Sequence, residues 1–347
     1  MAAEDSFVMQ AQAHAQPHTA AAHSGARLLP LIHGSWCIRE LAIMGTSIRV
    51  ELWADERATG ERAIAAVMDE MHRIDLAMSP HKPASELSRI NRHAFHEPVP
   101  VSAEMVALLG RSLEFSALSD GAFDITYASV GHLYDYRRGV KPDDHTLAQA
   151  CAGIGWQKLL LNPQLRTVRF AHPRTQIDLG GFAKGHAVNN AVRILREHGI
   201  QHAMVAAGGD SRLLGDRRGR PWMIAVRDPR RPGEVVAVLP LEDTAISTSG
   251  DYERYFLGPG GERHHHLIDP ATGRSPAAVR SVTILADDGL TSEALSKCVF
   301  VLGVERGLAL VESQPGVDAI VVDAGGALHC SSGLGGASST AGATPPQ

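Results

Sequence analysis

A glycine-rich segment, residues 178–185, is the first candidate for chemistry. It reads DLGGFAKG, and the residues around it predict a strand at 175–179 and a helix over 184–198. Glycines allow backbone N–H groups to approach a phosphate closely, and the first turn of a helix attracts anions. Lys184 would add a full positive charge. The segment matches neither GxGxxG nor a Walker A motif, so a tight strand-to-helix turn beside a solvated lysine remains the alternative.

Hydroxyl groups and histidines gather in two later segments, 247–252 (STSGDY) and 263–273 (RHHHLIDPATG). The first favours a loop that hydrogen-bonds a polar ligand. The second enters a predicted strand, in which His264 and His266 share one face and His265 lies on the other. A histidine near its ordinary pKa can act as a general base or stabilise charge. The alternatives are a polar strand edge or chance metal binding for the histidines, and a simple turn for DPATG.

Two shorter segments, 121–126 (GAFDIT) and 44–46 (MGT), carry little weight in isolation. Phe123 and Asp124 would lie in a ligand loop. Residues 44–46 come just before a predicted strand.

The elements that must position these segments mix strands and helices. The apolar spacing predicts a strand at 46–53, helices over about 61–78 and 291–302, and a helix that begins after Ser102 as its N-cap. It also predicts short strands at 158–162 and 166–170, a strand-rich stretch at 202–285, and a final helix with two short strands. Because a strict βαβ rhythm is missing, we expect an α+β fold with a single domain over 28–330.

Composition narrows the class of protein. The chain has 347 residues, 44% of them hydrophobic and 20% charged, and a net charge of -5. These values are typical of a globular protein and do not favour a nucleic-acid partner. The four cysteines are scattered through the sequence, which favours reduced core residues over a disulfide framework.

The two ends of the chain differ from the body. Residues 1–27 are rich in Ala and His, and 331–347 are rich in Ser, Gly, Ala, Thr and Pro, so both are predicted to be disordered or flexible. Neither a signal-peptide pattern, a lipoprotein-like cysteine nor an apolar run of membrane-spanning length is seen. We therefore expect a cytoplasmic protein without a membrane span, although a misassigned start could hide export.

The segments together, in their order along the chain, resemble the ApbE family, the FAD:protein FMN transferases. The resemblance covers about residues 40–330 and includes MGT at 44–46 and SPHKPASELSRIN at 79–91. It continues through GAFDIT, DLGGFAKG, STSGDYERYF, HHLIDPATG and a helix that ends in CVFVLG. Several matches in the family order are far more specific than any one of them.

The resemblance implies a substrate, a reaction and a set of site residues. FAD would bind in an extended cleft with a divalent cation, usually Mg²⁺, at its pyrophosphate. The Thr or Ser hydroxyl of an acceptor protein would attack the phosphorus on the riboflavin side, and AMP would leave. His266 would be the general base, with His265 as the fallback, and the carbonyl of Gly181 would face the metal. The expected FAD contacts are Met44, His81, Ala122, Phe123, Asp124, Asp178, Lys184 and Ile268.

The sequence departs from the family where the metal is expected. The family helix reads Asp-Ala-Leu-Ala-Thr, whereas this chain has Glu293-Ala294-Leu295-Ser296-Lys297. Glu293 and Ser296 still offer oxygens to a cation, but the ammonium of Lys297 has donors only. Three hypotheses remain open: a normal or shifted metal site, Lys297 in place of the metal, or an impaired enzyme. A plain i,i+4 pair of Glu293 with Lys297 is the simplest interpretation.

Smaller departures and other functions also remain open. His81 stands where the family has a Tyr against the flavin, and Ala206 stands where it has an Asn. The alternatives to transfer are an FAD pyrophosphatase, with water as acceptor, and a flavin-binding scaffold without turnover. The resemblance implies an acceptor with an Asp-x-x-Ser/Thr-Gly-Ala-Thr-like motif. Thr344 in the tail is a weak candidate for a self-acceptor.

Overall fold

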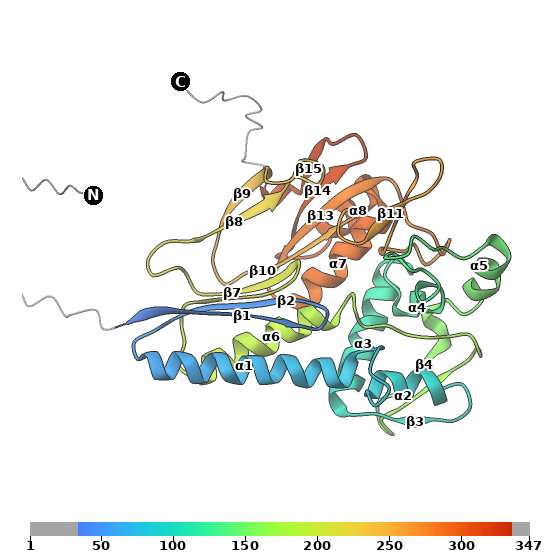
Figure 1. Cartoon of the computed structure of the whole chain (residues 1–347), viewed down its shortest axis with the longest axis horizontal. Coiled ribbons are helices and arrows are strands. Elements are labelled where there is room, and N and C mark those ends of the chain that lie inside the picture. Colours follow the sequence, from blue (N-terminus) through green and yellow to red (C-terminus); the bar gives the residue numbers. More distant parts are fainter. Residues whose placement is uncertain (1–33, 335–347) are drawn as a thin grey trace, which may run out of the picture. The chain divides into compact units, whose positions relative to one another are not determined.

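An antiparallel sheet of eight strands runs through the computed structural model, which describes residues 34–334 (Figure 1). The strand order is β1-β2-β6-β7-β10-β13-β14-β15, and each neighbouring pair is antiparallel. Strands distant in sequence are therefore neighbours, as β2 is of β6. The bounds are β1 Ser35–Ile43, β2 Thr46–Ala54, β6 Ala203–Ala207, β7 Asp210–Leu214, β10 Ala245–Gly250, β13 Val279–Ala286, β14 Asp318–Asp323 and β15 Leu328–Cys330.

Helices cover one face of this sheet in the same order as the strands. Helix α1 packs on β1 and β2, α6 on β6 and β7, α7 on β10 and β13, and α8 on β14. Alternate side chains of a strand point to one face, and on β2 the helix-facing set, Ile48, Val50 and Leu52, is fully buried. The bounds are α1 Arg57–Met78, α6 Ala183–Glu197, α7 Gly289–Leu302 and α8 Val304–Glu312.

A hairpin of β8 (Trp222–Arg227) and β9 (Val235–Leu241) covers the opposite face. Trp222 is buried there in a second apolar cluster with Leu213, Ile246 and Leu285 of the main sheet. The hairpin thus covers the opposite face of the sheet over β7, β10 and β13.

Residues between α1 and α6 build a smaller helical region with its own sheet of order β3-β5-β4. A two-stranded ribbon, β11–β12, follows β10. No helix within residues 34–334 is long and apolar enough to cross a membrane. The remaining elements are α2 Glu86–His93, β3 Val99–Pro100, α3 Ala103–Leu118, η1 Ile125–Tyr127, α4 Ala128–Gly131, α5 Asp144–Cys151, η2 Trp156–Lys158, β4 Leu159–Asn162, β5 Thr167–Phe170, β11 Tyr255–Leu257, β12 Arg263–His265 and η3 Ser332–Leu334.

Most predicted elements are confirmed, and so is the α+β class. The strand predicted at 46–53 is β2, and the helix predicted at 61–78 begins slightly earlier, at Arg57. Ser102 is the N-cap of α3, because its hydroxyl accepts a hydrogen bond from the N–H of Met105. Residues 1–33 and 335–347, with Thr344, lie outside the described residues. Ser331, where the predicted C-terminal tail begins, is buried and donates to Asp318.

The strand predicted at 175–179 was wrong, because this segment pairs with no other strand. Side chains hydrogen-bond its backbone instead. The amide of Asn91 bonds both the N–H and the carbonyl of Ile177, at 2.8 and 2.9 Å, and Ser129 accepts from the N–H of Gln176 at 3.0 Å. The alternate residues Thr175, Ile177 and Leu179 are buried, as a strand pattern predicts. The hydrogen-bond partners of this backbone, however, are polar side chains distant in sequence.

Two glycines allow α6 and α7 to touch at their first turns. A Cβ on Gly185 would lie 2.1 Å from the carbonyl oxygen of Gly289, and a Cβ on Gly289 would lie 2.4 Å from that of Gly185. Such distances are far inside van der Waals contact and involve backbone, which cannot move aside cheaply. This close contact fixes the position of the residues that follow in both helices.

Replacing Gly185 with Ala should lower the free energy of unfolding by about 2 kcal/mol or more, because the added methyl must push the two helices apart. Urea-induced unfolding measures the change. Gly110→Ala in α3 is the matched control, since its Cβ would meet only Leu161 Cδ2 at 4.0 Å. That change should stabilise the protein by about 0.5–1 kcal/mol. Equal effects of the two substitutions would contradict the packing argument.

Candidate active site

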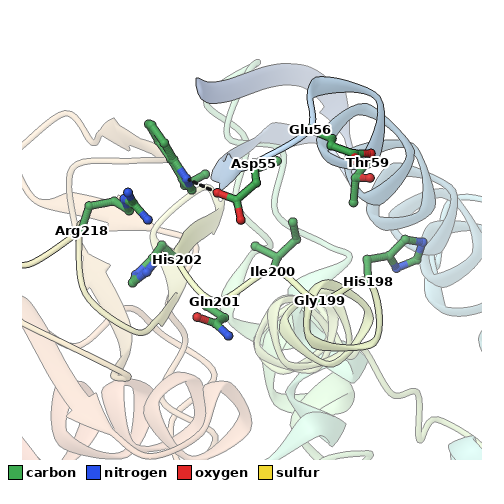
Figure 2. A pocket seen from close by; sticks show the side chains of 11 residues that line it. Asp55, Glu56, Thr59, His198, Gly199, Ile200, Gln201, His202 and Arg218 are labelled. Atoms are coloured by element: carbon green, nitrogen blue, oxygen red, sulfur yellow. Dashed lines mark hydrogen bonds between the residues drawn. The ribbon is translucent and has the colours of Figure 1, made fainter. Parts of the chain in front are cut away.

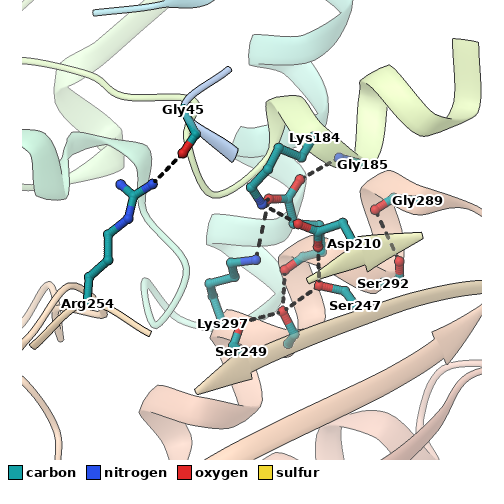
Figure 3. A network of polar contacts seen from close by, with 12 residues as sticks. Gly45, Lys184, Gly185, Asp210, Ser247, Ser249, Arg254, Gly289, Ser292 and Lys297 are labelled. Carbon is teal, nitrogen blue, oxygen red and sulfur yellow. Dashed lines mark hydrogen bonds and ion pairs between the residues drawn. The ribbon is translucent and has the colours of Figure 1, made fainter. Parts of the chain in front are cut away.

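Four charged side chains meet beside the contact between α6 and α7 (Figure 3). Lys184, in the first turn of α6, donates hydrogen bonds to Asp210 of β7 and, at 2.6 Å, to Oε1 of Glu293 in α7. Lys297 lies one turn after Glu293, with its Nζ 3.5 Å from the same oxygen. We call these four residues the charged quartet.

Backbone and hydroxyl groups complete the quartet. The N–H of Gly185 donates to Oε2 of Glu293 at 2.6 Å, and Ser247 donates to Asp210. Ser249 and Ser296 share a hydrogen bond of 2.8 Å between their hydroxyls. The segment 247–252 was predicted to be a loop, but residues 247–250 belong to β10, where the alternate residues Ser247 and Ser249 both reach α7. The buried carboxylates therefore have partners at each oxygen named here.

The charges of the quartet shift one another's pKa values. Burial alone would lower the pKa of Lys184, but Asp210 and Glu293 outweigh it and hold that pKa above its ordinary value. Burial would raise the pKa of Asp210, but Lys184 and Lys297 outweigh it and lower that pKa. For Lys297, burial dominates and lowers the pKa. Lys184 is thus a fixed cation between two carboxylates, whereas Lys297 is held much less firmly.

His266 directly follows β12 and is nearly enclosed. Its backbone N–H donates to the carbonyl of Arg254 at 3.1 Å, and its Nδ1 is buried without a hydrogen-bond partner. Burial, with the positive charges of Arg254 and Lys297, lowers the pKa of His266 to about 3. The ring is therefore unprotonated at neutral pH, the form in which a histidine can accept a proton.

His265 has a different environment. It is 2% exposed, its Nε2 lies 2.9 Å from the carbonyl oxygen of Pro276, and its ring packs edge-on against Phe300. This histidine serves the packing between β12 and α7. The geometry therefore favours His266 over His265 for proton transfer.

The expected FAD contacts fall into two groups. Asp178 lies near His81 and Arg254, and burial raises its pKa although the N–H of Gly180, which donates to its Oδ1 at 2.6 Å, and the charge of Arg254 oppose that shift. Lys184 belongs to the charged quartet. These residues surround the same region as His266.

The remaining expected contacts are largely structural. Phe123 packs its ring against Phe115 and Phe182, and Asp124 accepts from the N–H and hydroxyl of Thr126 at the start of η1. Ile268 is buried in a small apolar cluster, and Met44 adopts a positive φ of 56° in the turn between β1 and β2. Ala122, next to Phe123, is partly exposed.

Three residues near this site were not predicted from the sequence. Arg254 donates to the carbonyl of Gly45 at 3.3 Å and so links the β11 region to the β1–β2 turn (Figure 3). Tyr127 is surrounded closely enough that burial, then the charge of Asp178, raises its pKa. Asp210 follows two glycines and reads as part of a turn. No local pattern marks these three; only Arg254 lies inside a family segment, STSGDYERYF.

The residues expected to hold a metal are brought together, but with Lys297 among them. A Cβ on Gly181 would lie 3.5 Å from Cε of Lys297, and Nζ of the same lysine lies 3.5 Å from Oε1 of Glu293. Within residues 34–334, no group of three or more His, Cys, Asp or Glu side chains could hold a metal ion.

A cavity of about 400 Å³ lies elsewhere, at the C-terminal end of α6 (Figure 2). Trp53, Asp55, His202 and Arg218 are among its lining residues, and Trp53 donates to Asp55 at 3.2 Å. Lys184 is at the opposite end of the same helix, about 20 Å away at 1.5 Å per residue. None of the expected site residues lines this cavity, so we assign the chemistry to the charged quartet and His266 instead.

The fold and the ordered site segments define a flavin-transferase class, and the comparisons agree. The chain belongs to the ApbE family, whose model matches residues 44–321. It is 31% identical to the FAD:protein FMN transferase of Treponema pallidum over 84% of this chain and 86% of that protein. With the corresponding Haemophilus influenzae protein, the identity is 33% over 78% and 82%.

Solved structures agree with this assignment. The ApbE protein of Thermotoga maritima superposes with a TM-score of 0.80 at 32% identity, covering 87% of this chain and 98% of that one. The flavin transferase ApbE of Vibrio cholerae gives a TM-score of 0.77 at 28% identity, with 86% and 98% covered.

Lys184→Met should lower the free energy of unfolding by about 3–5 kcal/mol, because it leaves two buried carboxylates without their main partner. Chemical denaturation measures the loss. Lys82→Met is the control: its ion pair with Asp75 is 2.7 Å long, but the lysine side chain is 39% exposed. Removing that pair should cost about 1 kcal/mol or less. A small effect at Lys184 would mean that the quartet is not a buried charge network.

Acid should destabilise the protein partly through His266. The unfolded chain binds a proton at its ordinary pKa of 6.5, whereas folded His266 excludes one until about pH 3. Stability is therefore lost progressively as pH falls below about 6.5, and His266→Gln should lose less between about pH 6.5 and 4.5. Thermal unfolding at each pH measures this, with His96→Gln, at an exposed site, as control. Identical pH slopes for parent and His266→Gln would disprove the burial of this imidazole.

Proposed function

We propose that this protein is an FAD:protein FMN transferase. It would cleave FAD, attach the FMN half by a phosphoester to a Thr or Ser hydroxyl of an acceptor protein, and release AMP. Membership of the ApbE family and the names of its relatives support this function. The observation that carries it in this chain is an unprotonated, partly exposed His266, with a buried Nδ1, near the charged quartet.

The residues suit an anionic substrate. The loop at 178–182 leads into α6, and the partial positive charge of this helix terminus favours an anion, although the N–H of Gly185 already donates to Glu293. Arg254 and Lys297 add full charges near His266. A pyrophosphate held here would have its negative charge neutralised from several sides, which is the main requirement of phosphoryl transfer.

The step needs one proton acceptor. The acceptor hydroxyl oxygen forms a bond to the phosphorus on the riboflavin side while the bond from that phosphorus to the bridging oxygen breaks. AMP leaves with the bridging oxygen, and Nδ1 of His266, which has no partner in the described structure, would take the hydroxyl proton. An approaching pyrophosphate would raise the pKa of His266, because a negative charge favours the imidazolium.

The Mg²⁺ implied by the family resemblance fits this donor set poorly. Oε1 of Glu293 accepts from Lys184 at 2.6 Å, and Oε2 accepts from the N–H of Gly185 at 2.6 Å. The hydroxyl of Ser296 is bonded to Ser249 and to the carbonyl of Glu293, at 2.8 Å each. An ammonium group stands beside these oxygens, and it would repel a divalent cation. We therefore assign no step of the reaction to a metal.

The partner of the reaction is proposed from the family pattern. An acceptor protein with an Asp-x-x-Ser/Thr-Gly-Ala-Thr-like motif would present its hydroxyl to the site. Such a segment must be extended and accessible, because the phosphorus it attacks lies beside the buried quartet.

The purified protein, FAD and an acceptor carrying this motif should yield AMP and an acceptor whose mass rises by one FMN. His266→Gln should reduce the rate by about 10²–10⁴-fold, the usual contribution of a positioned base. It should leave FAD binding, followed by flavin fluorescence, nearly unchanged. His264→Gln, on β12 beside Phe256, is the matched control and should retain most activity.

Three outcomes would contradict the proposal in different ways. AMP release without flavin on the acceptor would identify a pyrophosphatase. FAD binding without AMP release would identify a flavin-binding scaffold. A fully active His266→Gln variant would remove His266 from the reaction.

A further inference from the structure

Lys297 differs from Lys184 in how it is held. Lys184 has two short hydrogen bonds to carboxylates, whereas the one hydrogen bond of Lys297 Nζ within residues 34–334 goes to Glu293 and is 3.5 Å long. That distance is at the outer limit of a hydrogen bond. An ammonium group has three donors, so most of the donor capacity of Lys297 is left for a ligand.

The surroundings of Lys297 show that a simple i,i+4 ion pair with Glu293 does not fully describe this lysine. Its side chain is 18% exposed, while that of Glu293 is 0% exposed. A surface i,i+4 pair has water around both partners, but here one partner is inside the protein and the other reaches the edge of the site. Glu293 is also already neutralised by Lys184, at 2.6 Å. Glu293 thus takes its short hydrogen bonds from Lys184 and from the N–H of Gly185, and not from Lys297.

The position of Lys297 is the second argument. Its Cε lies 3.5 Å from a Cβ placed on Gly181, and its Nζ lies 3.5 Å from Glu293. It also contributes to lowering the pKa of His266. The ammonium thus stands among the glycine loop, α7 and the candidate base, where the pyrophosphate of a bound FAD would have to lie for His266 to reach the attacking hydroxyl.

The charges of the site agree with this placement. The two lysines and two carboxylates of the quartet sum to zero formal charge, and a pyrophosphate diester brings two negative charges. Since Asp210 and Glu293 both bond Lys184, the cation left to face the substrate is Lys297, with Arg254 nearby. A divalent cation added here would meet an ammonium at close range.

We propose that the ammonium of Lys297 contacts the pyrophosphate of FAD in place of a divalent cation, so that this transferase works without a metal. This inference rests on the proposed function. Lys297 neutralises the oxygens of the departing AMP phosphate as the bond to the bridging oxygen breaks, while His266 removes the proton of the acceptor hydroxyl.

The test compares the parent protein with Lys297→Thr and Lys297→Met, each in EDTA and in excess Mg²⁺. We expect the parent rate of AMP release to differ by less than about twofold between the two conditions. Lys297→Met should lose about 10²-fold or more in both, as expected for one lost charge contact in a transition state. Lys297→Thr should lose as much in EDTA and recover in part with Mg²⁺, because its hydroxyl and Glu293 offer oxygens.

A binding measurement separates this inference from the proposed function. Mn²⁺, followed by its electron paramagnetic resonance signal, should remain free with the parent protein and FAD but bind to Lys297→Thr. In EDTA, FAD should bind at least about tenfold more weakly to Lys297→Met than to the parent. Lys82→Met, which removes a lysine outside the quartet, should bind FAD as the parent does.

The outcomes differ in what they overturn. A parent enzyme that stops in EDTA and recovers with Mg²⁺, or that binds Mn²⁺ stoichiometrically, would overturn the role of Lys297 and leave the transferase function intact. A parent protein that releases no AMP under any condition would overturn the transferase function. In that case, unchanged FAD binding by Lys297→Met would overturn the Lys297 contact as well, and weaker binding would support it.

Discussion

The site depends on the contact between the first turns of α6 and α7. Gly185 and Gly289 bring the two backbones so close that no side chain fits between them. At this distance the N–H of Gly185 reaches the carboxylate of Glu293, and Lys184 reaches both Glu293 and Asp210. The three elements α6, β7 and α7 are thereby joined through the ammonium of Lys184. Any change in the spacing of the helices would separate a charge from its partner.

Because of this packing, the two lysines of the charged quartet have different electrostatic surroundings. Lys184 lies between two negative charges, and its ammonium offsets the free-energy cost of burying these carboxylates. Lys297, one helical turn after Glu293, has a weak hold on the same carboxylate. The two lysines therefore have different tasks, although both lie beside Glu293. One stabilises the site and the other leaves a positive charge open to a substrate.

The sequence predicted the regular elements better than the site. The periodic apolar residues of α1 and α7 and the alternation of β2 follow directly from which faces are buried, so they can be read without the structure. The segment at 175–179 had the right composition for a strand, but Asn91 and Ser129 supply its hydrogen bonds. No local rule identifies partners at that separation.

The same difference between local patterns and contacts made by the fold separates the site residues that the sequence predicted from those that it did not. Residues inside recognisable segments, such as Lys184, His266 and Glu293, were predicted as site residues from the sequence. Asp210 and Tyr127 were not, because their importance comes from what is packed around them in three dimensions. The separate tasks of His265 and His266 also needed the structure. Both are neighbours in one motif, and each has a buried Nδ1 without a partner within residues 34–334, but His265 alone bonds a backbone carbonyl, that of Pro276, through its Nε2.

The pairing of β2 with β6, and the contact of Arg254 with Gly45, connect parts of the chain that are about 150 and 209 residues apart. Contacts of such high sequence separation form late, because the loop between them must be closed first. On the proposed function, the nucleotide site is therefore a property of the completed fold. A ligand bound only by the native state would stabilise the entire sheet by mass action. Saturation with substrate should make the whole domain slower to open, including strands that never touch it.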